Sequence, residues 1–124
     1  KIMGIGPVPA VRKLSAKSGD AVGDYGLVEL NEAFAAQVIA CLKAWQDDAY
    51  CREALGLEGP LGVLDEGRLN VDGGAIAQGH PVGASGARIV LHLLQVLERT
   101  GGQRGIAAIC IGGGQGGAML LERC

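Results

Sequence analysis

Two glycine-rich stretches place the strongest limit on how this chain can fold. The chain has 124 residues, and 22 of them are glycine, against an ordinary share of about 7%. Five of these glycines fall within residues 73–86 and eight within residues 101–117. Glycine permits backbone conformations and close approaches that a side chain forbids. The clustering therefore predicts tight, functional turns inside a compact α/β domain rather than a low-complexity linker.

Length and composition are those of an ordinary single domain. With 124 residues and 48% hydrophobic content, the chain can bury one core, so a single domain over residues 1–124 is expected. The formal net charge is −2, and the 11 Lys and Arg residues are scattered. Nucleic acid and anionic membranes are excluded as leading partners, because both require a concentrated basic surface. No apolar run reaches the roughly 18 residues of a membrane span.

The cysteines and histidines do not form a metal or disulfide pattern. The four cysteines and two histidines include no Cys-x-x-Cys spacing, so no structural zinc or other metal site is expected. A domain with this much hydrophobic content can be stable without disulfides. Free thiols in a reducing compartment are therefore predicted. The first residue is Lys1 rather than Met, which predicts a processed or excised piece.

Hydrophobic periodicity predicts alternating helices and strands. A helix is expected over residues 10–17, capped by Gly19, and a second over residues 33–46 with an apolar stripe of Phe34, Val38, Leu42 and Trp45. A third helix is expected over residues 87–99, with core-facing residues Ile89, Leu93, Val96 and Leu97. Strands are expected over residues 25–30, 69–71, 105–111 and 118–122. This order predicts an α/β layered domain.

His80 lies in the sequence Gly79-His80-Pro81, inside the long glycine-rich segment that opens into the third helix. Proline restrains the backbone after the histidine, and glycine lets a ligand approach closely. A histidine in this position suits a general base or a donor to an oxyanion. The alternative is a loop histidine bonded to a backbone carbonyl, and spacing alone leaves both open.

Cys110 and Asn31 each stand at the end of a predicted strand. Cys110 precedes three glycines, where a thiol could move a proton, although position alone favours a small buried hydrophobe. Asn31 lies between a strand and a helix. Its position alone favours an N-cap of that helix, against an amide that holds a water or a substrate oxygen.

Other candidate residues have structural explanations. His92 is expected in solvent on the polar face of the third helix, Cys41 is expected to pack, and Cys51 and Cys124 are given no role. The spacing Gly112-x-Gly114-x-x-Gly117 matches a dinucleotide fingerprint formally, but it opens no helix. These glycines are predicted instead to present backbone N–H groups to a reacting carbonyl.

Three longer motifs agree with one protein family. They are residues 28–37 (VELNEAFAAQ), residues 70–88 (NVDGGAIAQGHPVGASGAR) and residues 110–116 (CIGGGQG). In this order and spacing the chain resembles the C-terminal half of the thiolases, or acetyl-CoA acyltransferases, along nearly its whole length. The resemblance implies a thiolase-like layered α/β fold with one α/β repeat, a mixed β-sheet flanked by helices, and only the C-terminal half of the family's fold.

The resemblance implies a role for each matching residue. His80 is implied to activate a nucleophilic cysteine and then to help bind the thioester oxygen. Cys110 is implied to move protons to and from the substrate α-carbon or the coenzyme A thiol. Asn31 is implied to hold a water that completes the first oxyanion hole with His80, and the N–H of Gly112 to help form the second. Ala33 and Phe34 are implied to lie near the acyl–pantetheine channel.

The resemblance also implies what the chain lacks alone. The family's nucleophilic cysteine belongs to the N-terminal half, so the isolated chain is expected to be inactive and to pair with that half. Acyl-CoA and coenzyme A are expected as substrates, with no permanently bound cofactor. A homo-oligomer, dimer or tetramer, is expected. The expected compartment is the cytoplasm, with an organelle as the alternative.

Two other interpretations remain. The first is a stand-alone thiolase-like module that binds acyl-CoA or serves as an accessory subunit. The presence of His80, Cys110 and Asn31 favours the enzyme, because a binding module needs no proton-transfer thiol. The second is a condensing enzyme of the ketosynthase type, which generally has His or Asn where this chain has Cys110. The long connection over residues 47–68 favours a degradative 3-ketoacyl-CoA thiolase over a biosynthetic one.

Overall fold

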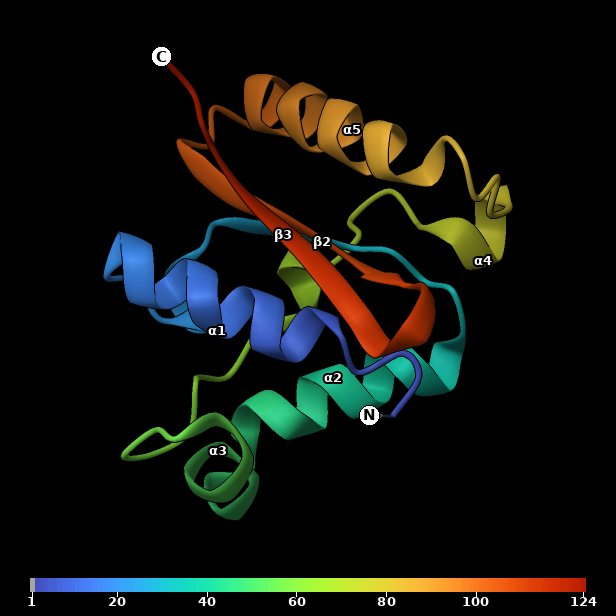
Figure 1. Cartoon of the computed structure of the whole chain (residues 1–124). Helices are drawn as coiled ribbons and strands as arrows, with labels where there is room; N and C mark the ends of the chain where they lie inside the picture. Colours follow the sequence, from blue (N-terminus) through green and yellow to red (C-terminus); the bar gives the residue numbers. More distant parts are fainter. Residues whose placement is uncertain (1) are drawn as a thin grey trace.

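A computed structural model describes residues 2–124 and shows three layers (Figure 1). The central sheet holds β1 (Leu27–Leu30), β2 (Arg104–Ile111) and β3 (Gln115–Glu122). Helix α5 (Ser85–Thr100) covers one face, while α1 (Pro7–Ser18) and α2 (Ala35–Gln46) lie on the other. The shorter helices are α3 (Asp48–Leu55) and α4 (Ala75–Gln78). The predicted mixed sheet flanked by helices is confirmed.

Strand β2 lies in the middle of the sheet and fixes where the neighbouring strands end. It pairs in parallel with β1, with Leu30 opposite Ala108, and antiparallel with β3. Immediately after β1, the backbone N–H of Asn31 donates to the carbonyl of Ala108 at 2.9 Å. The residues that follow β1 and those that end β2 therefore meet at one edge of the sheet, which is where ligands bind in parallel sheets.

Side chains of β2 alternate between two cores. Ile106 and Ala108 pack in the larger core with Trp45 of α2, whereas Ala107 packs with Leu93 of α5. Because successive residues of a strand face opposite sides of the sheet, Cys110 lies on the same side as Ala108, facing α1 and α2. The four residues predicted to face the core from α5 are all buried.

Two of the three predicted helices begin earlier than the sequence patterns suggest, and α2 begins two residues later, at Ala35. Helix α1 starts at Pro7 rather than residue 10, because a proline fits the first turn, where its missing N–H would be unpaired in any case. It ends as expected at Gly19, which adopts the left-handed conformation at φ 80°. Helix α5 begins at Ser85, two residues before the predicted start. None of the helices described over residues 2–124 is long and apolar enough to cross a membrane.

Two predicted features of the core are wrong. Phe34 precedes α2 with an extended backbone, so its side chain leaves the apolar stripe and is 60% exposed. Residues 69–71 form no strand: Leu69 makes one bridge to Val28, and then Asn70, at φ 44°, turns the chain away. The segment after this turn contains the single turn of α4 rather than a continuous loop.

Two glycines allow α1 to cross β3 in direct backbone contact. A Cβ atom at Gly116 would overlap the carbonyl of Gly6, and a Cβ at Gly6 would overlap the carbonyl of Gln115. Both obstacles are backbone atoms, so neither clash can be relieved by a rotamer change. These contacts set the distance between α1 and the sheet.

Replacing Gly116 with alanine is predicted to lower the free energy of unfolding by about 2 kcal/mol, because the added methyl group separates α1 from β3. Chemical denaturation measures the change. The matched control is Gly86→Ala in α5, where a new Cβ meets nothing within 4 Å. That substitution should leave stability unchanged or raise it by up to ~1 kcal/mol. Equal stability of Gly116→Ala and the wild type would contradict the close approach.

Candidate functional site

The candidate site is a pocket at the carboxyl edge of the sheet. It has a volume of about 270 Å³, and its walls include His80, Cys110, Gly112 and Phe34. Four of the six predicted site residues therefore share one pocket although they come from three separate segments of the chain. Ala33 is half-buried and is not among the residues that line it. Met3 and Val82, which the sequence analysis did not single out, add exposed apolar surface to the same wall.

Both glycine-rich stretches contribute residues to the walls of the pocket. The first carries His80, which follows α4 and precedes α5. The second forms the turn η3 (Gly112–Gly114) between β2 and β3, in which Gly113 and Gly114 have φ values of 76° and 74°. These conformations strain any residue with a side chain. The turn therefore keeps Gly112 at the pocket next to the end of β2.

His80 is oriented by the first turn of α5. Its Nδ1 lies 2.6 Å from Oγ of the fully buried Ser85, and this Oγ donates to the carbonyl of Pro81 at 3.1 Å. A serine hydroxyl has one proton. Because Ser85 donates this proton in its hydrogen bond to the carbonyl of Pro81, its oxygen accepts a hydrogen bond from Nδ1–H of His80. The neutral ring then has an unprotonated Nε2, as a general base requires. Arg88 also donates to the carbonyl of Gly79 at 2.6 Å.

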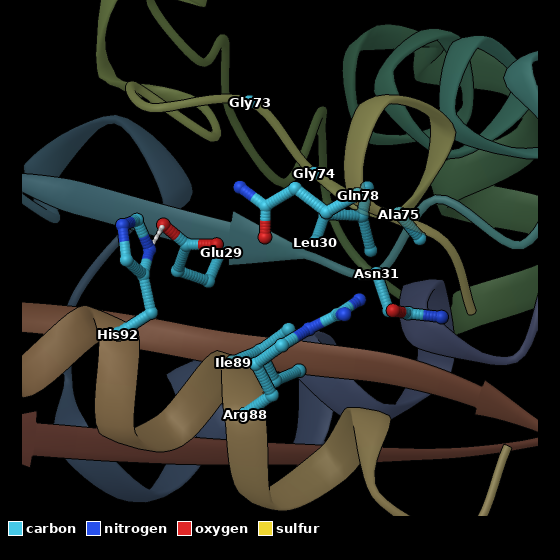
Figure 2. Close-up of a pocket in the computed structure, with 10 residues that line it drawn as sticks. All are labelled: Glu29, Leu30, Asn31, Gly73, Gly74, Ala75, Gln78, Arg88, Ile89 and His92. Atoms are coloured by element: carbon cyan, nitrogen blue, oxygen red, sulfur yellow. Dashed lines mark hydrogen bonds and ion pairs between the residues drawn. The ribbon is translucent and has the colours of Figure 1, made fainter. Parts of the chain in front are cut away.

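Asn31 lines a second, much narrower pocket on the α5 side of the same edge. Figure 2 shows Asn31 entering from the end of β1 and Arg88 from α5. Asn31 is 2% exposed, and within residues 2–124 neither its Oδ1 nor its Nδ2 has a hydrogen-bond partner. The prediction that Asn31 caps the following helix is wrong, because Phe34 occupies the cap position.

The size and polarity of this pocket suit a single small polar molecule. Its volume is about 10 Å³, close to the minimum that one water occupies. A buried amide without a partner is costly, so a hydrogen-bonding guest beside Asn31 would lower the free energy of the folded chain. Asn31 and the pair His80 and Cys110 thus occupy neighbouring pockets rather than one.

The cysteines differ sharply in their surroundings. Cys110 is half-buried at the main pocket, while Cys41 is fully buried and donates weakly to the carbonyl of Gly4 at 3.6 Å. Burial raises the pKa of Cys41 to about 11, and its side chain packs in the larger core, as predicted. Cys51, which was given no role, is also fully buried and donates to the carbonyl of Ala44 at 3.3 Å. Cys124 is exposed.

His92 does not lie free in solvent, and that prediction is wrong. Its ring contacts Glu29 of β1 and Asp72 through hydrogen bonds of 2.7 Å and 2.9 Å. Burial lowers the pKa of His92, but its bonds to Asp72 and Glu29 outweigh this effect and the net shift is upward. Burial raises the pKa of Glu29. The helical periodicity placed His92 on a polar face, and it could not show that a buried glutamate lies opposite that face.

Comparison with known proteins gives one family. The sequence profile described as "Thiolase, C-terminal domain" matches residues 1–123. The chain is 49% identical over 124 residues to the beta-ketoadipyl-CoA thiolase of Pseudomonas putida, covering 99% of the chain and 27% of that protein. It is 48% identical over 122 residues to the cytosolic acetyl-CoA acetyltransferase of Mus musculus, covering 98% of the chain and 26% of that protein.

A third relative, which carries a different name, matches the chain at a comparable sequence identity. The chain is 48% identical over 124 residues to the 3-ketoacyl-CoA thiolase of Photorhabdus laumondii, covering 98% of the chain and 28% of that protein. The chain thus spans about a quarter of the length of the curated relatives that it matches.

The contact between Ser85 and His80 predicts one tautomer of the neutral ring. In the wild type at alkaline pH, the proton should reside on Nδ1 of His80, whereas Ser85→Ala should shift it toward Nε2. Long-range ¹⁵N NMR of the imidazole rings measures the distribution, and the chain has only two histidines to assign. Ser18→Ala is the control, because its hydroxyl bonds Tyr25 instead. A wild-type proton on Nε2 would contradict the assignment.

Proposed function

Because the chain belongs to the thiolase family, as that family's C-terminal domain, we propose that it is the catalytic C-terminal half of a thiolase. The complete protein would transfer an acyl group between a 3-ketoacyl-CoA and coenzyme A, by thiolytic cleavage or by the reverse Claisen condensation. The observation that carries the proposal is the shared pocket of His80, Cys110 and Gly112. An imidazole, a thiol and a backbone N–H are the groups that this chemistry requires at one place.

The first half of the proposed reaction forms an acyl-enzyme. Nε2 of His80 takes the proton from a cysteine thiol of the upstream half, and the thiolate attacks the 3-keto carbonyl. The bond between C2 and C3 breaks, its electron pair stays on C2, and Cys110 protonates that carbon as acetyl-CoA leaves. An acyl thioester remains on the upstream cysteine, which divides one difficult step into two easier ones.

The second half of the reaction returns every group to its starting state. The Cys110 thiolate takes the proton from the coenzyme A thiol, which then attacks the acyl thioester. The upstream cysteine leaves as a thiolate and recovers its proton from Nε2 of His80. Negative charge develops on a carbonyl oxygen in each half. We assign His80 and a water held by Asn31 to the thioester oxygen, and the N–H of Gly112 to the acyl-enzyme oxygen, since preplaced donors stabilise such charges strongly.

The walls of the pocket suggest where the substrate chain lies. Phe34 is 60% exposed at the pocket and Val82 is 81% exposed, so both offer apolar surface beside the reacting groups. We assign Phe34, with Ala33 next to it, to the acyl–pantetheine channel. Coenzyme A acts here as a substrate, and the scheme needs neither a resident cofactor nor a metal.

The upstream half is the proposed partner of this chain. It would supply the nucleophilic cysteine and cover apolar side chains such as Leu91 of α5, which is 58% exposed. We also propose a homo-oligomer of the complete protein and keep the cytoplasm as its predicted compartment. Relatives with three different names match at 48–49% identity, so we propose that acyl specificity is set mainly outside this chain.

The test of this function is Cys110→Ser in the chain joined to its natural upstream segment. Thiolysis of a 3-ketoacyl-CoA should fall about 10²–10⁴-fold, because the proton donor to C2 is removed. The control is Cys124→Ser, an exposed thiol away from the pocket, which should keep full activity. Full-rate thiolysis and α-proton exchange by Cys110→Ser would refute the assignment, and acyl-CoA binding without turnover by the wild type would support an accessory role.

A further inference from the structure

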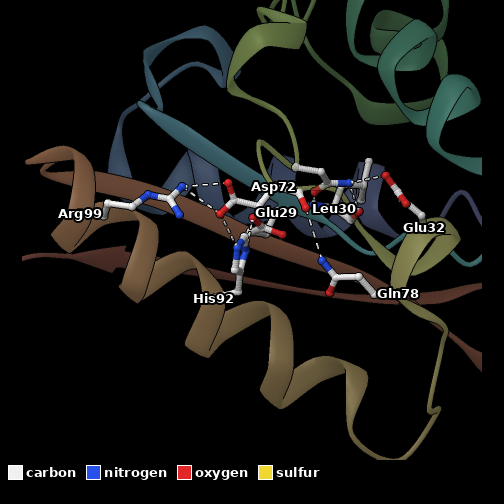
Figure 3. Close-up of polar contacts among 8 residues, drawn as sticks. Glu29, Leu30, Glu32, Asp72, Gln78, His92 and Arg99 are labelled. Carbon is white, nitrogen blue, oxygen red and sulfur yellow. Dashed lines mark hydrogen bonds and ion pairs between the residues drawn. The ribbon is translucent and has the colours of Figure 1, made fainter.

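His92 bridges two carboxylates from separate segments of the chain, Glu29 in β1 and Asp72 in the turn that follows Asn70. Its Nδ1 lies 2.7 Å from Oε1 of Glu29, and its Nε2 lies 2.9 Å from Oδ2 of Asp72. The glutamate side chain is only 6% exposed and the imidazole 24%. Figure 3 shows the ring of His92 reaching from α5 to a place between the carboxylates of Glu29 and Asp72.

The two short contacts require an extra proton in the cluster. A neutral imidazole has one N–H and one acceptor nitrogen, while an ionised carboxylate only accepts. Hydrogen bonds from Arg99 and His92 lower the pKa of Asp72, so this acid is the ionised partner. Both contacts therefore hold together when the imidazole is protonated or when Glu29 keeps its own proton and donates it to the ring. The directions of the two shifts agree with this, because the pKa values of His92 and Glu29 are both raised.

Three other charged side chains lie near the His92 ring or its two carboxylates: Arg99, Glu32 and Arg88. Arg99 of α5 donates to both carboxylate oxygens of Asp72, at 2.9 Å and 2.8 Å. Glu32, just after β1, raises the pKa of Glu29 by repulsion. Arg88, one helical turn before His92, lines the same narrow pocket. Arg99 therefore continues to hold Asp72 when the histidine loses its proton, while the neutral ring, with one N–H left, can donate to only one of the two carboxylates.

Asp72 begins the segment that leads to His80, and this segment lies outside the sheet ladder. On its β1 side, Glu32 accepts from the N–H of Ile76 at 3.0 Å and from Nδ2 of Asn70 at 2.9 Å. Asn70 in turn pairs with both backbone groups of Leu30. On its other side the segment faces α5. Among the residues described, the only hydrogen bonds between residues 72–78 and α5 are those of the Asp72 carboxylate to His92 and Arg99.

We propose that His92 is a positioning residue: its protonated bridge between Glu29 and Asp72 holds residues 72–78 against α5, and loss of that proton loosens this segment, which leads to His80. The site would then be sensitive to pH through a histidine that touches no substrate. The consequence for catalysis rests on the proposed function of His80, but the bridge itself does not.

The sign of the pH effect follows from the raised pKa of His92. The bridge should be complete below the ordinary value near 6.5, and it should weaken as pH rises through the higher value in the folded chain. Hydrogen exchange at Ile76, Gln78 and Gly79 reports on it, because their amides are bonded to Glu32, Gly74 and Ala75. After correction for intrinsic rates, protection at these amides should fall about tenfold across the His92 titration, which NMR of its ring records.

Matched variants separate the bridge from general packing. His92→Phe should show low protection with no step, while Gln95→Ala, an exposed position on the same helix, should behave as the wild type. Arg99→Gln should enlarge the step, because it removes the remaining link between Asp72 and α5. A His92 ring that titrates at or below its ordinary pKa, or an equal step in His92→Phe, would overturn the proposal. These measurements do not require catalysis. If the complete protein were inactive, the proposed function would be refuted, but this inference would still stand.

Discussion

The parallel pairing of β1 with β2 is the constraint on which the candidate site depends. Register places Leu30 opposite Ala108, so β1 ends beside the last residues of β2. Asn31 then lies on the α5 side of this edge and Cys110 on the side of α1 and α2. A slip of one residue would turn each side chain to the opposite face. The geometry of both pockets is thus a consequence of strand register before any loop is considered.

The loop that carries His80 is fixed by side chains rather than by the sheet. After the single bridge at Leu69, the chain is attached to β1 through Asn70 and Glu32. On the other side, it is attached to α5 through the pair of Asp72 with His92 and Arg99, and then through Ser85 and Arg88 around His80 itself. Hydrogen bonds to charged groups are stronger than neutral ones but depend on protonation. The loop that carries His80 is therefore held partly by groups whose protonation can change, which is the basis of the pH effect that we propose for His92.

Much of the architecture could be predicted from the sequence because local rules agree with the packing. The buried positions of α5 follow helical periodicity, and Gly19 caps α1 in the left-handed conformation as expected. The wrong predictions occur where tertiary contacts decide. Phe34 matches the helical spacing of its neighbours but precedes the helix, and Asn70 ends an apparent strand by adopting a positive φ.

The candidate site divides in the same manner. The motifs indicated His80, Cys110 and Gly112, which the fold brings to one pocket, while their chemical roles remain predictions. Periodicity could not reveal the environment of His92, because its partners Glu29 and Asp72 lie 63 and 20 residues away in sequence. The spacing of His80 and Ser85, five residues apart, was a local signal that could have been found from the start of the helix.

We propose that this chain carries the acid–base groups of a thiolase but not its nucleophile. The most direct test of this proposal is intact mass spectrometry after incubation with acetyl-CoA, with and without the natural upstream half. We expect an acetyl group on the upstream half and none on this chain under either condition. A stable acetyl thioester on Cys110, formed by this chain alone, would contradict it.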